Sequence, residues 1–239
     1  MAAGYRIAAA LVVLSVLMLI PIPGKPEPSA AGETNMAPYI PNMKEIVKVT
    51  LGFFKSNGAG QWALILPMGI GFIAVSGIDN LWQPLFLEKQ NEHLVWILGY
   101  AWVFIRLGTL AAGIIARSLR TRVNTQKYFG LALLGSAVFV SLSAWLQLWW
   151  LSAFTFALHA SAWVLFSVLT DGYLYKAIPG ESKATTLSTL SSFYSVTGIM
   201  GMLTLSLLAD YSIALAFFAA SAVFILAFFS AGFLRKKVH

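Results

Sequence analysis

The sequence predicts an all-α polytopic membrane protein with about seven transmembrane helices, and three observations support this fold class. Of the 239 residues, 59% are hydrophobic and 10% are charged, whereas soluble domains carry about 25% charged residues. The mean hydropathy is +0.78. The charged residues cluster in short segments between long apolar runs, which is the pattern of segments that face lipid or one another inside a bilayer.

A membrane-spanning helix needs about 20 predominantly apolar residues, because each residue advances the helix by about 1.5 Å. The segments that meet this requirement are Ile7–Ile22, Trp62–Leu87, Leu94–Ala116, Tyr128–Leu146, Trp149–Tyr173, Ala184–Leu208 and Ser212–Leu234. The first of these is the shortest. Gln147 separates the fourth span from the fifth, and Trp149 and Trp150 suit the aromatic belt at the membrane interface.

The basic residues predict the orientation of these spans. If the N-terminus is outside, most of the 16 Lys and Arg residues fall in cytoplasmic segments. These residues are Lys25, Lys44, Lys48, Lys55, Arg117, Arg120, Arg122, Lys127, Lys176, Lys183, Arg235, Lys236 and Lys237. Cytoplasmic loops carry the excess of Lys and Arg in membrane proteins. We therefore expect the N-terminus outside and the C-terminus inside.

An alternative for the first segment is a cleaved signal peptide, with Arg6, an apolar core and small residues at Ser29–Ala31. Cleavage there would place the basic segment 117–127 outside the membrane. That placement contradicts the charge rule, so a transmembrane helix is the preferred interpretation.

Residues 23–61 predict a cytoplasmic, Pro-rich linker that contains an amphipathic helix at Asn42–Asn57. One side of this helix carries Met43, Ile46, Val47, Leu51 and Phe54, and the other carries Lys44, Lys48 and Lys55. Such a helix suits the headgroup region, with its lysines toward anionic lipid. A solvated connector helix is an equal alternative.

The chain resembles the C-terminal half of a major facilitator superfamily (MFS) transporter, beginning at that family's sixth helix. The third span ends in Gly113-Ile-Ile-Ala-Arg117-Ser-Leu-Arg120-Thr-Arg122, which is similar to the family's cytoplasmic loop motif, with Arg117 where an acid is expected. The segment Pro179–Ser188, which includes Glu181 and Lys183, is similar to the family's junction between its fifth and sixth helices in this half. The ending Leu208-Ala209-Asp210 is also common there.

The resemblance implies a domain organisation and a function. Residues 1–22 correspond to the sixth MFS helix, 23–61 to the central cytoplasmic loop, and 62–239 to the C-terminal six-helix bundle of 3+3 inverted repeats. The implied function is secondary active transport of a small solute by alternating access, with proton coupling as the family default. The implied location is the bacterial cytoplasmic (inner) membrane, and no cofactor is implied. A transporter of this type needs an N-terminal bundle or a second copy as partner, so we expect the chain alone not to transport.

Ionisable groups within a bilayer cost at least about 2.5 kcal/mol near its centre, so they mark candidate translocation sites. Arg106 shares a helix face with Trp102, and small or polar residues continue that face at Gly99, Thr109 and Gly113. The predicted role is contact with an anionic group or pairing with a carboxylate. Asp79, with Trp82 and Gln83 on its general face, is a candidate ion site and a candidate partner for Arg106; the alternative is a wetted residue at the outer interface.

His159 and Trp163 share a face of the fifth span, and a histidine there suits proton coupling. A neutral packing histidine is the alternative. Asp171 lies about 120° around the helix from His159, and we expect it to form an interfacial salt bridge with Lys176 or Lys183. Asp171, Glu181 and Lys183 are therefore predicted to be structural charges.

The last two spans differ in composition. Small residues in the sixth span predict close helix packing or a solute path; they are Ser188, Ser191, Ser192, Ser195, Gly198 and Gly201. The last span contains several phenylalanines and no charge before Arg235, and it is expected to be a lipid-facing scaffold.

Other function classes find little support in the sequence. The chain has no Cys, three His and no clustered carboxylates, so no metal site and no enzymatic activity is expected. No basic patch lies in a soluble segment, so nucleic acid is not an expected partner. A seven-helix receptor remains the alternative of another class, although the last span lacks the lysine that a retinal protein needs.

Overall fold

A computed structural model describes residues 58–89, 96–119, 126–178 and 183–235. These residues form helices and their connections, and the described part contains no strand. The helices are α3 (Gly58–Ile78), α4 (Trp82–Glu88), α5 (Trp96–Leu119), α6 (Gln126–Trp145), α7 (Trp149–Ala177), α8 (Lys183–Ala209) and α9 (Ile213–Arg235). The predicted first span, the linker helix, Arg120, Arg122 and Glu181 lie outside the described residues.

Five of the described helices are long and apolar enough to cross a membrane: α5, α6, α7, α8 and α9. Helices α3 and α4 meet the same test when they are taken together as one bent span. The prediction of an all-helical membrane protein is thus confirmed for the described residues. The break at Gln147 is confirmed too, because α6 ends at Trp145 and α7 begins at Trp149.

The predicted span Trp62–Leu87 is not continuous, because α3 and α4 meet at an angle of 43°. The chain turns at Asp79–Leu81. Pro84 explains this position, since a proline ring clashes with the carbonyl of the residue four positions earlier and cannot donate to it; that residue is Asn80. The amide of Asn80 also donates to the backbone oxygen of Ser76 at 3.0 Å, which favours a turn over a continuing helix.

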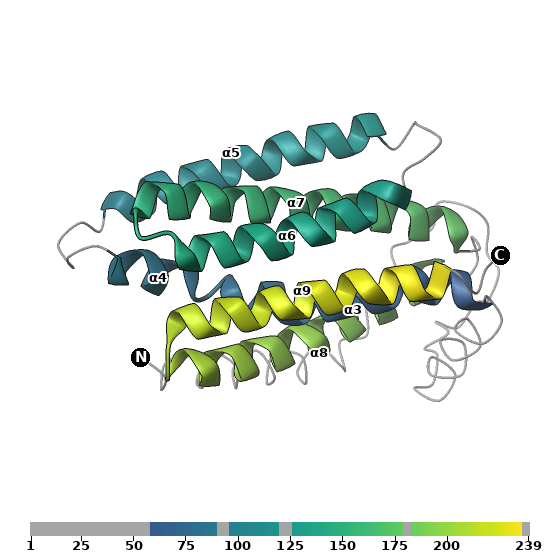
Figure 1. The fold of residues 1–239 in the computed structure, drawn as a ribbon. Helices are drawn as coiled ribbons and strands as arrows, with labels where there is room; N and C mark the ends of the chain where they lie inside the picture. The colour runs from purple at the N-terminus through teal and green to yellow at the C-terminus, as the bar shows by residue number, and fades with distance from the viewer. Residues whose placement is uncertain (1–57, 90–95, 120–125, 179–182, 236–239) are drawn as a thin grey trace, which may run out of the picture.

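The helices lie side by side in the order α5, α7, α6, α9, α3 and α8 (Figure 1). The extensive contacts join α5 to α7, α7 to α6, α6 to α9, α9 to α3, and α3 to α8. Each of the end helices, α5 and α8, makes its extensive contact with one neighbour. Their candidate spans are accordingly the least buried of the five.

Glycines bring the two end helices close to their neighbours. A side-chain carbon at Gly201 of α8 would collide with the backbone carbonyl of Ile73 on α3. One at Gly108 of α5 would lie 2.5 Å from the Ser161 hydroxyl oxygen on α7. The close packing expected at Gly201 from the small residues of the sixth predicted span is therefore present, and α5 uses the same device.

Candidate functional site

The break between α3 and α4 places Asp79 near Arg106. Asp79 directly follows the last residue of α3, and its backbone N–H still donates to the oxygen of Val75 at 2.9 Å. The guanidinium of Arg106, on α5, attracts the Asp79 carboxylate electrostatically. Arg106 also lies over the ring of Trp102, with 4.9 Å between the guanidinium carbon and the ring centroid. Three of the predicted site residues thus lie in one neighbourhood.

Trp82 and Gln83 follow the same break but differ in their surroundings. Trp82 is buried, and its ring packs 6.3 Å from that of Phe156 on α7, measured between centroids. It belongs to the hydrophobic core. Gln83 is exposed and is therefore the one of the two whose side chain is accessible beside the break.

Arg106 is exposed on α5, together with Trp102. The buried positions of α5 follow helical spacing and face α7; they include Ala101, Ile105 and Ala112. A guanidinium in the interior of a membrane span is costly unless protein or water surrounds it. Lipid alone is therefore a poor environment for the exposed face of α5 that carries Arg106.

His159 lies apart from this neighbourhood, fully buried among aromatic rings. Its ring centroid lies 5.5 Å from that of Phe156 and 5.2 Å from that of Phe224 on α9. Neither ring nitrogen has a geometrically defined hydrogen-bond partner among the described residues, although the backbone of Ser136 on α6 lies close enough to act on the ring. These surroundings favour the packing alternative over contact with a solute.

Trp163 connects α7 with α3. Its ring lies edge-on to Phe72, with 5.4 Å between centroids, and it fills the space beside Gly71, where an added side-chain carbon would meet it. The residue is buried. Its partner Phe72 lines the cavity described next, so Trp163 supports the wall of that cavity from behind.

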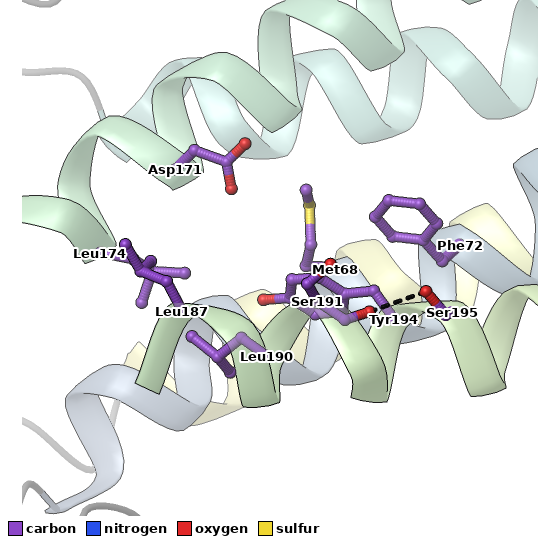
Figure 2. Close-up of a pocket in the computed structure, with 9 residues that line it drawn as sticks. All are labelled: Met68, Phe72, Asp171, Leu174, Leu187, Leu190, Ser191, Tyr194 and Ser195. Carbon is purple, nitrogen blue, oxygen red and sulfur yellow. Dashed lines mark hydrogen bonds between the residues drawn. The ribbon is translucent and has the colours of Figure 1, made fainter. Parts of the chain in front are cut away.

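A cavity of about 360 Å³ lies between α3, α7 and α8 (Figure 2). Its lining combines one carboxylate, three hydroxyl-bearing residues and an apolar remainder. The lining residues are Met68, Phe72, Asp171, Leu174, Leu187, Leu190, Ser191, Tyr194 and Ser195. Figure 2 shows the Asp171 carboxylate directed from α7 toward the side of α8 that carries the serines and Tyr194.

Asp171 faces this cavity, while the two lysines expected to pair with it lie elsewhere among the described residues. Neither Lys176 nor Lys183 lines the cavity, and the ammonium of Lys183 lies 4.0 Å from the centroid of the Tyr175 ring. Asp171 instead acts electrostatically on Tyr194. Tyr194 and Phe72 were not among the predicted site residues. The signal in the sequence was Ser191, which lies three residues before Tyr194 and four before Ser195 and so shares a helix face with both.

Lys89 joins the end of α4 to the turn between α6 and α7. Its ammonium donates to the backbone oxygens of Ser143, Ala144 and Leu146, at 2.5, 3.1 and 2.5 Å, and to the hydroxyl of Ser152 at 3.2 Å. These oxygens include unpaired carbonyls at the end of α6. Burial lowers the pKa of Lys89 to about 8, against a smaller rise due to Glu88. The amine thus stays largely protonated at neutral pH, and it anchors the α4 half of the bent span to the end of α6.

Comparison with protein-family models, with curated proteins and with solved structures finds no match for this chain.

Proposed function

We propose that the chain forms one side of the solute pathway of an MFS-type secondary transporter in the bacterial cytoplasmic membrane, with its N-terminus outside. The proposal is carried by the break in a membrane span at Asp79, whose carboxylate is attracted electrostatically by the exposed Arg106 on α5. Broken helices at mid-membrane commonly build binding sites for solutes and coupling ions in secondary transporters. Paired charges inside a membrane also mark translocation pathways.

The pattern of helix contacts supports the 3+3 arrangement that the resemblance implies. If α3–α4, α5 and α6 are exchanged for α7, α8 and α9, the extensive contacts map onto one another. The contact of α3 with α8 becomes that of α7 with α5, and the contact of α3 with α9 becomes that of α7 with α6. Gly201 and Gly108, which bring α8 and α5 close to their neighbours, also exchange roles.

The exposed faces of α5 and α8 favour a second bundle of helices as the other side of the pathway. Large apolar side chains are exposed on both helices, including Leu107 on α5 and Met200 on α8. Lipid satisfies such residues, but it does not satisfy Arg106 on α5. The proposed partner covers the face with Arg106 and leaves an aqueous path between the two bundles.

We expect proteoliposomes that contain only the purified chain to show no coupled solute flux, because the described bundle forms one side of the proposed pathway. Vesicles that contain the chain together with the proposed second bundle should accumulate one member of a panel of labelled sugars, amino acids, organic anions and amines. Vesicles of the same lipid without the protein are the control. Robust coupled flux by the chain alone would contradict the need for a second bundle, and absence of flux in the assembly for every class would contradict transport.

A further inference from the structure

The cavity between α3, α7 and α8 contains a single charged group among its described lining residues, the carboxylate of Asp171. An ionised carboxylate accepts hydrogen bonds and donates none. The hydroxyl of Ser195 donates to the backbone oxygen of Ser191 at 2.9 Å, so its remaining capacity toward the cavity is also that of an acceptor. The polar side of the cavity therefore favours a ligand that carries positive charge and N–H donors.

The apolar side of the cavity presents an aromatic pair. The rings of Phe72 and Tyr194 are stacked, with 5.2 Å between centroids and 6° between planes. Aromatic faces attract cations as well as apolar groups. Met68 and Leu190, both almost fully buried, line the cavity beside this pair, which suits an apolar or aromatic body on the ligand.

The hydroxyl of Tyr194 points independently to a ligand. Tyr194 is 8% exposed and lines the cavity, and its hydroxyl oxygen is buried without a hydrogen-bond partner among the described residues. A buried hydroxyl without a partner costs about 1–3 kcal/mol. Asp171 acts on Tyr194 electrostatically, so a ligand ammonium held between the two groups would supply the partner that this hydroxyl lacks.

We infer that this cavity binds a small organic ammonium ion, with its charged group at Asp171 and Tyr194 and its apolar body against Phe72. The volume of about 360 Å³ lies at the lower end of the range for small-molecule pockets, about 300–1,000 Å³, so the ligand has the size of a small metabolite. A metal ion is a poorer fit, because the described residues contain no group of three or more metal-ligating side chains. Binding of the ammonium ion does not depend on the proposed function. Only the further step, that the bound cation is also the transported solute, rests on it.

Binding is tested with three probes of similar size and different charge: phenethylammonium, the neutral phenethyl alcohol and the anion 3-phenylpropanoate. Because the chain has no Cys, a single Ser191→Cys substitution places one thiol on the cavity wall. In nanodiscs, phenethylammonium is expected to slow alkylation of this thiol severalfold, and the other two probes are expected to leave the rate unchanged. Equal protection by the alcohol would overturn the inference, since the cavity would then bind apolar groups without regard to charge.

Variants identify the groups responsible. Asp171→Asn is expected to weaken binding of labelled phenethylammonium at least about tenfold, because it removes the one charged group among the described lining residues and leaves the ligand ammonium unpaired. Tyr194→Phe is expected to weaken it about threefold to tenfold. The control is Asp210→Asn, the same change directly after the last residue of α8, whereas the cavity lies beside the first half of that helix. This variant should bind phenethylammonium as the unaltered chain does. Unchanged affinity in Asp171→Asn would overturn the inference; if that variant does not fold, retained binding in Asp171→Glu and the comparison of the three probes decide the question.

The two proposals fail separately. Saturable binding of phenethylammonium without flux of any amine supports the ammonium site and contradicts transport of this ligand class. Flux of another solute without binding of phenethylammonium retains the transporter and overturns the ammonium site.

Discussion

Gly201→Ala should destabilise the packing of α8 on α3 more than any other single methyl addition at a described glycine. The added carbon would overlap the backbone carbonyl of Ile73, and a backbone group cannot move aside by changing a rotamer. Overpacking of this kind typically costs about 1–3 kcal/mol. The expected result is a clear fall in the melting temperature of the detergent-solubilised chain. Size-exclusion chromatography after heating to a series of temperatures measures this melting temperature.

Gly99→Ala is the matched control for Gly201→Ala. An added carbon at Gly99 on α5 meets nothing within 4 Å, and alanine is favoured over glycine inside a helix by up to about 1 kcal/mol. The control should therefore melt at the same temperature as the unaltered chain or higher. Equal melting temperatures for the two variants would contradict the close approach of α8 and α3.

Arg106→Ala and Asp79→Asn should each reduce solute flux in the assembled transporter at least about tenfold. Removal of either charge leaves the other without an opposite charge inside the membrane, where an ionised side chain costs at least about 2.5 kcal/mol near the centre. The double variant is expected to lose less than the two single effects combined, because residues that interact are not additive. Initial rates of uptake measure all three.

The control for these variants is Asp210→Asn, which removes a carboxylate from the turn after α8 and should leave flux unchanged. If Arg106→Ala and Asp79→Asn retain both flux and substrate affinity, the two residues are structural. A charge-exchanged variant, Asp79→Arg with Arg106→Asp, separates the need for a pair from the need for each charge at its own position.

Span positions were predictable because the length of an apolar run limits where a helix can leave the membrane. Predicted and observed spans agree closely for α8, which begins at Lys183 where Ala184 was expected. The bend between α3 and α4 was not predicted, although Asp79 and Pro84 were visible. Both belong to an apolar segment that satisfies the span criterion as a whole, so average hydropathy conceals the local break.

The last span was predicted only in part: Phe218, Leu226 and Phe229 are exposed as a lipid-facing helix requires, but another face of α9 is buried. A segment without charge was expected to face lipid, yet Phe217 and Phe224 of α9 are fully buried, because α9 lies between α3 and α6. In a membrane protein, apolar residues suit both lipid and the protein interior. Composition alone therefore does not distinguish a peripheral helix from a central one.

The neighbourhood of Asp79 and Arg106 was anticipated because their helices are consecutive and both charges lie inside spans. The cavity at Asp171 was not anticipated, since it combines Phe72, Asp171 and Tyr194 from three segments far apart in the chain. Only the packing of α3 against α8, with α7 alongside, brings these residues together. The predicted structural role of Asp171 stays a prediction, and the proposed ammonium site is a second prediction for the same residue.

Water access beside Arg106 tests the central claim most directly. In sealed vesicles that contain the assembled transporter, a single cysteine at Thr109, whose hydroxyl donates to the backbone oxygen of Arg106 at 3.0 Å, should react with a membrane-impermeant charged thiol reagent. A cysteine at the exposed Leu107, about 160° away around α5 by helical geometry, should not react. This difference is the predicted result. Equal protection of both thiols would mean that no aqueous path passes Arg106, and would contradict the proposed pathway.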